Sequence, residues 1–457
     1  MLVDRIGIAT TLLVISLAGA CHAAPAAAEN WRSLFDGKTL SGWERAGGNA
    51  QYRVEKGEIV GTLTDTSPLN TWLVTQRSYG DFIVELEIKL DDDRGNSGVL
   101  VRAHVDPYSG AAYGQQVEAD PSERAWTGGI YDEERRGWLY QLQLNEPARR
   151  AYKKNDYNRL RIECIGHETR TWVNDIPTAY VVDDVDTDGF IGLQLHTAYD
   201  KSWIGGHVRF RNIRIQTGNL QPRPMAPGVY ALNLLPNTLT DYERREGYRL
   251  LFDGVTSAGW KGARLDGFPA TGWRIAGGAL SVEAADGKEG ANGGDLASEQ
   301  TYQAFDLSFE FRFTDGAEGG VKYLVPSAAP QAAAVPALEY RIADDAQPEA
   351  TQRDRDVRLS VASLLGLLPA QKQPDFVYPA KTWNRGRIVV SRDGTVAHYL
   401  NGMRVLEYDR NSAAFRQLLT ASGLQGIEGS GQNAGGHILL EEHGRPVSFR
   451  SIKLKPL

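Results

Sequence analysis

Apolar and polar residues alternate along many short stretches of this chain. The stretch from Gly95 to Val105 is an example, in which one apolar set alternates with a mixed set: Val99, Val101, Ala103 and Val105 against Leu100, Arg102 and His104. A period of two places each set on one face of a β-strand. Similar stretches, separated by Gly-rich turns, recur along the chain and predict an all-β protein built from antiparallel sandwiches.

The pattern occurs twice within the 457 residues. The stretch LFDGKTLSGW, from Leu34, returns as LFDGVTSAGW from Leu251, and later stretches follow in the same order. In both final strands, HVRFRNIRI and PVSFRSIKL, the apolar alternation slips by one residue, which predicts a β-bulge in each. We predict two related domains, at residues 30–218 and 248–457, joined by a Pro-rich linker at 219–247. A short helical turn is expected at 362–370.

The N-terminus has the pattern of an export signal. Arg5 precedes an apolar stretch at 6–20 that is short for a membrane span, and small residues follow it. Residues 1–28 are therefore predicted to be a signal peptide, with a possible lipobox at Cys21. The expected location is the periplasm, or the membrane surface as an anchored lipoprotein if Cys21 is lipidated.

Polar residues share one face on each of three predicted strands of the first half. This face is rich in groups that exchange protons or form directional hydrogen bonds, more so than a solvated strand face requires. It is predicted to be a binding or catalytic groove, and ordinary surface is the alternative. Its members are Arg102 and His104 on one strand, Gln116, Glu118 and Asp120 on the next, and Gln194 and His196 on the third.

Aromatic residues in nearby loops are candidates for the rim of this groove. Trp126, Tyr131 and Trp138 lie in a charged, Gly-rich loop that follows the second strand. Indole faces offer large contact areas that stack on sugar C–H surfaces. The net charge of −7 argues against a nucleic-acid partner. A small carbohydrate or glycoside is the expected substrate.

Two further interpretations of the carboxylates stay open. Glu118, Asp120 and Glu123 have the spacing of the retaining β-glucanase motif, although Pro121 is expected to end the strand before Glu123. No cofactor is certain, but a divalent metal ion is an alternative. Its candidate ligands are His104, Glu118, Asp120 and His196.

In combination, these motifs resemble the 3-keto-disaccharide hydrolase domain family. The resemblance rests on LFDGKTLSGW, YRVEKGEIVG, GNSGVLVR, GFIGLQLH and VRFRNIRI in the first half, and on LFDGVTSAGW, KTWNRGRIVV and VSFRSIKL in the second. It implies two tandem concanavalin A-like jelly-roll sandwiches. It also implies an exported enzyme that cleaves glycosides whose C3 hydroxyl has been oxidised to a ketone, with a sugar 3-oxidoreductase as a partner in the same pathway.

A C3 ketone acidifies the C2 proton, so a base can start β-elimination of the C1 substituent, and water adds afterwards. We expect His196 to be the base, with Glu118 as second candidate. Arg102 or a divalent ion would hold the enolate oxygen, and Tyr131 would protonate the leaving group. The candidates for substrate binding are Asn96, His104, Gln116, Asp120, Gln194, Trp126 and Trp138.

The second half changes most of these residue types. Its candidate residues are Lys322, Glu339, Arg341, Glu441 and His443. The first domain is therefore favoured as the active one, and the second is left open between another specificity and a binding role. A non-catalytic glycan-binding protein and a conventional retaining β-glucanase are the alternatives for the whole chain.

Overall fold

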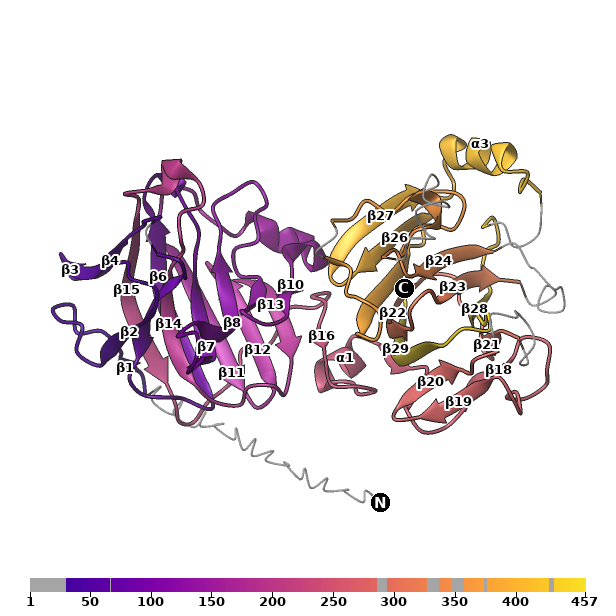
Figure 1. Ribbon diagram of the computed structural model, residues 1–457, viewed down its shortest axis with the longest axis horizontal. Helices are drawn as coiled ribbons and strands as arrows, with labels where there is room; N and C mark the ends of the chain where they lie inside the picture. The colour runs from indigo at the N-terminus through magenta and orange to yellow at the C-terminus, as the bar shows by residue number, and fades with distance from the viewer. Residues whose placement is uncertain are drawn as a thin grey trace, which may run out of the picture.

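The computed structural model describes residues 30–65, 67–285, 294–326, 337–346, 357–373, 376–426 and 431–457. The predicted signal peptide and Cys21 lie outside the described residues. Within these ranges the chain forms two β-sandwiches that lie side by side (Figure 1). We call the sandwich of β1 to β15 the first domain and that of β17 to β29 the second domain. The predicted all-β fold is confirmed.

The first domain packs a larger sheet against a smaller one. In hydrogen-bonded order the larger sheet is β16 (Leu232–Asn233), β13 (Ile176–Val182), β12 (Glu168–Val173), β11 (Asn158–Ile165), β6 (Phe82–Leu90), β15 (His207–Gln216), β4 (Glu58–Thr62) and β3 (Tyr52–Glu55), with β1 (Arg32–Ser33) paired to β15. The smaller sheet is β10 (Gly137–Tyr140), β9 (Ile130–Glu133), β8 (Ala112–Ala119), β7 (Ser97–Val105), β14 (Phe190–Leu195), β5 (Thr71–Thr75) and β2 (Trp43–Gly47).

The second domain repeats this arrangement. Its larger sheet runs β19 (Trp273–Ala276), β20 (Ala279–Val282), β29 (Val447–Pro456), β22 (Phe305–Phe313), β25 (Asn384–Val390), β26 (Thr395–Leu400) and β27 (Met403–Asp409), with β17 (Arg249–Leu250) paired to β29. Its smaller sheet runs β18 (Trp260–Gly262), β21 (Leu296–Ser298), β28 (His437–Leu440), β23 (Glu318–Val325) and β24 (Leu338–Ala343).

Alternation explains why the smaller sheet of the first domain has one apolar face. Val99 of β7, Val117 of β8 and Leu193 of β14 lie in the core between the sheets. The residues between them, such as Gln116 and Gln194, therefore face outward. The two predicted bulges are confirmed: β15 shifts register between Arg211 and Arg214, and β29 shifts opposite Ser308 and Glu310 of β22.

The segment between the domains is packed rather than extended (Figure 1). Its strand β16 pairs in parallel with β13, and a capping box with Thr240 as N-cap begins helix α1 (Asp241–Arg245). Glu243 in this helix forms a buried ion pair with Lys453 of β29, at 2.5 Å. Because a buried ion is stable only when it is paired, this contact fixes the connecting segment on the second domain.

The helical turn expected at 362–370 is wrong. Leu364 instead forms isolated bridges with Tyr340 and Leu368, because this segment adds to the edge of β24. A helix forms elsewhere, at α3 (Ala413–Ala421), where Ser412 caps its N-terminus. Short 3-10 turns are η1 (Asp91–Asp93), η2 (Leu142–Leu144), η3 (Glu146–Arg150), η4 (Lys201–Trp203) and η5 (Val357–Leu359). Among the described residues, no helix is long and apolar enough to cross a membrane.

Core packing gives the first prediction. Phe311 is fully buried between the sheets of the second domain, whereas Val255 is 76% exposed. We expect Phe311→Ala to lower the free energy of unfolding of this domain by about 3–5 kcal/mol, because it leaves a cavity. The control Val255→Ala should change it by less than about 0.5 kcal/mol. Denaturant titration measures both, and equal midpoints would contradict this assignment of the core.

Candidate active site

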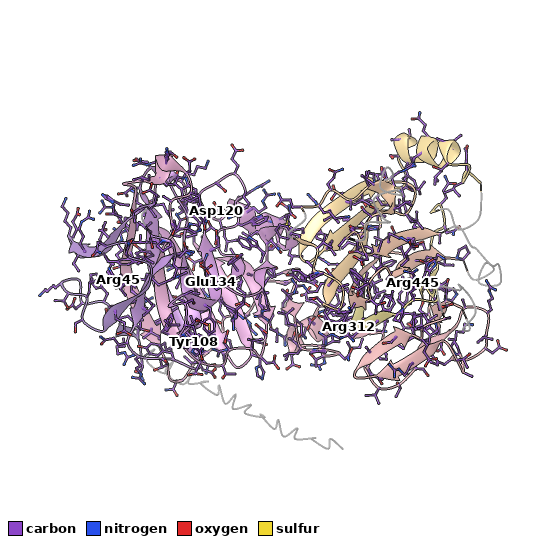
Figure 2. All side chains as sticks on the ribbon, viewed as in Figure 1. Arg45, Tyr108, Asp120, Glu134, Arg312 and Arg445 are labelled. Carbon is purple, nitrogen blue, oxygen red and sulfur yellow. The ribbon has the colours of Figure 1, made fainter. Side chains whose placement is uncertain are left out.

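A pocket of about 950 Å³ lies over the outer face of the smaller sheet of the first domain, and the second domain forms one side of it. This volume suits a ligand larger than one sugar ring. Several predicted site residues line it together: Asn96, Gln116, Glu118, Trp126, Tyr131, Trp138, Gln194 and His196. Figure 2 labels Glu134, which lines the pocket, between Asp120 and Tyr108 in the view of the first domain.

The Glu118 side chain is buried and surrounded by hydrogen-bond donors. Asn96 Nδ2 donates to Oε1 at 2.5 Å, and Gln116 Nε2 donates to Oε2 at 2.7 Å. Arg124 Nη2 adds a contact of 3.1 Å to Oε1. Burial nevertheless raises the pKa of Glu118 to about 7. Both protonation states are therefore populated at neutral pH, as acid–base catalysis requires.

Two acceptor oxygens beside Glu118 have no partner within the described part of the chain. Gln194 Nε2 donates to Gln116 Oε1 at 2.8 Å, which leaves Gln194 Oε1 buried and unpaired. Asn96 Oδ1 is likewise buried without a hydrogen-bond partner among the described residues. An unpaired buried acceptor is costly. Both residues line the pocket.

Arg124 is a site residue that the sequence pattern did not identify. Its Nε donates to Asp120 Oδ2 at 2.8 Å, and its guanidinium lies over the rings of Trp126 and Trp138, at 4.7 and 5.0 Å. Asp120 itself is absent from the pocket lining, so it positions Arg124 rather than contacting a ligand. The four residues 121–124 turn back over the face because Pro121 follows the end of β8, as expected.

His196 has the form of a neutral base. Its Nδ1 lies 2.7 Å from the carbonyl oxygen of Thr197. Since a carbonyl only accepts, Nδ1 carries the proton, and Nε2 keeps a lone pair. Burial lowers the pKa of His196, which favours this neutral form. Its ring is enclosed by the rings of Tyr199 and Trp203.

Glu133 is a second buried carboxyl in the pocket and was also missed. Asn70 Nδ2 donates to its Oε1 at 2.6 Å, and Asn70 Oδ1 accepts from the backbone of Thr197, beside His196. Burial raises the pKa of Glu133 to about 7. The period of two could have identified Glu133 from the sequence, because it lies two residues after Tyr131 and therefore on the same face of the strand. Tyr131 pairs with Gln116 in the β8–β9 ladder.

The predicted positions of Arg102 and His104 on the polar face are wrong. The ladder between β7 and β8 shifts between Val101 and His104, and Arg102 has a positive φ of 48°. This bulge turns Arg102 away, where it donates to the carbonyls of Gly80 and Gly166 and pairs with Asp81. His104 lies opposite Tyr113, on the other face from Gln116.

The structure does not gather the candidate metal ligands. Among the residues described, no group of three or more His, Cys, Asp or Glu side chains has the arrangement of a metal site. His104 lies on the other face, and both Glu118 and Asp120 are occupied by Arg124. Glu123 is exposed and does not line the pocket, so the third carboxylate of the glucanase motif is also absent from it.

The matching face of the second domain is occupied by its own ion pairs. The strand register places Lys322 opposite Glu339, where Leu100 lies opposite Gln116 in the first domain. Lys322 pairs with Glu441, and Arg341 pairs with Glu318 at 2.6 Å. His443 Nε2 lies 3.3 Å from Glu441. Burial alone would raise the pKa of Glu441, but His443 and Lys322 lower it to about 2.

Comparison with known protein families finds the same family in both halves of the chain. The model of a 3-keto-alpha-glucoside-1,2-lyase-like domain matches residues 30–216 and 247–455. A 3-keto-disaccharide hydrolase from Bacteroides thetaiotaomicron is 29% identical over 233 residues, which are 46% of this chain and 79% of that protein.

The similar solved structures each cover 38% to 49% of the chain. One, from Parabacteroides distasonis, carries a provisional assignment as a glycosyl hydrolase; it is 22% identical with a TM-score of 0.41, over 49% of this chain and 99% of its own. A carbohydrate binding module from Bacillus subtilis is 18% identical with a TM-score of 0.28, over 38% of this chain and 95% of its own.

The Arg124 contact predicts a shift in the titration of Glu118. Burial raises its pKa, and the positive charge of Arg124 opposes that rise. We expect Arg124→Met to raise the pKa of Glu118 above about 7, since the opposing charge is lost. The exposed control Glu123→Gln should leave it in place. Carboxyl NMR titration, with Glu118→Gln to assign the signal, measures the shift, and an unchanged or lower pKa would refute the contact.

The burial of Glu133 predicts a pH-dependent cost in stability. Its pKa rises from 4.5 to about 7 on folding, so the native state holds the proton more tightly than the unfolded state. Stability therefore falls as the pH rises from about 4.5 to 7. We expect Glu133→Gln to raise the Tm at pH 8 more than at pH 5, whereas Glu123→Gln should show no such difference. Equal shifts at both pH values would contradict the burial of an ionisable carboxyl.

Proposed function

Because the chain belongs to the 3-keto-alpha-glucoside-1,2-lyase-like domain family in both of its halves, we propose that its first domain cleaves 3-keto-glucosides at the glycosidic bond. The family supports a carbohydrate-active enzyme of the glycosidase type. The single observation that carries the finer proposal is a neutral imidazole in one pocket with two carboxyls whose pKa values are about 7.

The first step is removal of the C2 proton by Nε2 of His196. The C3 ketone makes this proton acidic, and the electron pair becomes an enolate. The Arg124 guanidinium, held by Asp120, stabilises the charge on the enolate oxygen in place of Arg102. The unpaired acceptors of Asn96 and Gln194 bind hydroxyls of the sugar.

The second step breaks the bond between C1 and the leaving oxygen. The enolate electrons form the C1–C2 double bond, and the leaving oxygen takes a proton from the Glu133 carboxyl. A pKa of about 7 keeps a large fraction of this group protonated at neutral pH. Tyr131, whose pKa is raised by burial, stays protonated and donates a hydrogen bond to the same oxygen.

Hydration reverses the proton positions. Ionised Glu133 takes a proton from water as the oxygen adds to C1, and protonated His196 returns a proton to C2. The sum is hydrolysis, with both residues restored. The substrate must come from an enzyme that oxidises the C3 hydroxyl of a glycoside, so we propose a sugar 3-oxidoreductase as a pathway partner in the exported compartment.

Solvent deuterium tests this order of steps. In D2O, the 3-keto-glucose product should carry deuterium at C2, because the proton removed there is exchanged before it returns. Mass spectrometry measures the label, with unlabelled product incubated alone as the control. Direct displacement at C1 would leave C2 unlabelled and refute the elimination.

Substitution of His196 tests the assignment of the base. We expect His196→Ala to lower kcat for a 3-keto-glucoside by at least about 100-fold while the folded state is kept. Full activity would remove His196 from the mechanism. In a panel with native glycosides, saturable binding without any product would instead identify a glycan-binding protein, and hydrolysis of unoxidised β-glucan that depends on Glu123 would identify a glucanase.

A further inference from the structure

The second domain reaches the pocket of the first through the β26–β27 hairpin and through residues that precede β25. Gln141 of the first domain donates to the carbonyl oxygen of Asn401 at 3.2 Å, and the backbone of Arg404 donates to Gln143 Oε1 at 2.9 Å. The turn fits so closely that a Cβ on Gly402 would lie 2.1 Å from Gln141 Oε1. The side chain of Gln141 is fully buried there, so the hairpin is seated on the first domain.

This contact brings a mostly apolar wall to the pocket. The second domain contributes Phe376, Tyr378 and Met403, together with the amide of Gln373. Phe376 and Met403 pack against the apolar cluster of the first domain that contains Trp126, Tyr140 and Leu142. The polar groups that would bind a sugar ring come from the first domain. The first domain therefore supplies most of the polar lining together with the rings of Trp126, Tyr131 and Trp138, and the second domain adds a mostly apolar wall.

Two buried asparagines hold this wall in place. Asn401 Nδ2 donates to the carbonyl oxygen of Phe376 at 2.7 Å and to Asn384 Oδ1 at 2.8 Å. Asn384 Oδ1 accepts from the backbone N–H of Tyr378 at 3.0 Å, and its Nδ2 donates to the carbonyl of Tyr378 at 3.1 Å. Since Asn384 and Asn401 are at most 1% exposed, the wall is formed before a ligand arrives.

We propose that the second domain supplies the leaving-group subsite of the first domain's active site, and that this subsite selects an aromatic leaving group. The inference rests on the proposed function. A second sugar would need several hydrogen-bonding partners, but the second domain offers the Gln373 amide and the Tyr378 hydroxyl, which already donates to the carbonyl of Arg136 at 3.4 Å. Phe376 and Met403 instead match a phenol ring, through ring packing and sulfur–aromatic contact.

The test compares two substrates on the full chain, a 3-keto aryl glucoside with a 4-methoxyphenyl group and 3-keto methyl glucoside. We expect Phe376→Ala with Met403→Ala to lower the ratio of kcat/KM values, aryl over methyl, by about 10-fold or more, as loss of an apolar contact does. Phe376→Leu should give a smaller loss. The control Leu265→Ala, at a position 44% exposed, should leave the ratio unchanged. An unchanged ratio in the double variant overturns the proposal.

Binding of 4-methoxyphenol separates this inference from the proposed function. Quenching of tryptophan fluorescence should show saturable binding to the unaltered chain and to His196→Ala, and weaker binding to the double variant. If phenol binds in this way but no 3-keto substrate is cleaved, the proposed function fails and the subsite stands. If phenol does not bind, or binds all three proteins equally, the subsite is wrong whatever the activity.

Discussion

The polar side chains on the outer face of the smaller sheet must satisfy their own hydrogen bonds, because Gln116, Glu118 and Gln194 are buried. Around Glu118, hydrogen bonds from Asn96, Gln116 and Arg124 to its carboxylate meet this requirement. The same burial keeps Glu118 and Glu133 near neutral pKa and His196 uncharged. The acid–base chemistry of the proposed function thus depends on desolvation of these groups.

The second domain meets the same constraint in another way. At the positions of Leu100, Gln116 and Glu118 it has Lys322, Glu339 and Arg341. Lys322 pairs with Glu441, and Arg341 pairs with Glu318. Burial and the neighbouring Glu441 raise the pKa of Glu339. Charges that neutralise one another hold the sheet together but offer little to a ligand. This difference is the reason that the proposed function places the chemistry in the first domain and gives the second a supporting role.

Period-two alternation predicted the sheets, the two terminal bulges and the positions of Gln116, Glu118, Gln194 and His196. It failed at Arg102 and His104, because a bulge in β7 moves the residues after Val101 to the opposite face of the sheet. The sequence gives no sign of this bulge, since Ala103 is apolar and packs in an apolar cluster on the outer face. Arg124 lies in a loop, where no period applies. The wall of Phe376 and Met403 depends on how two domains pack, which alternation within one strand does not encode.

The asparagine pair behind that wall has a counterpart in the first domain, where Asn174 Nδ2 donates to Asn158 Oδ1 at 2.8 Å and the pair holds the backbone of Ala151 and Lys153. One brace, inherited by both copies of a duplicated gene, thus steadies an ordinary loop in one copy and a substrate-facing wall in the other. The brace holds the backbone of Phe376 and Tyr378, so substitution of the Phe376 side chain leaves these hydrogen bonds in place. Under the proposed function, a new leaving-group preference would need few mutations in the second copy and none in the first.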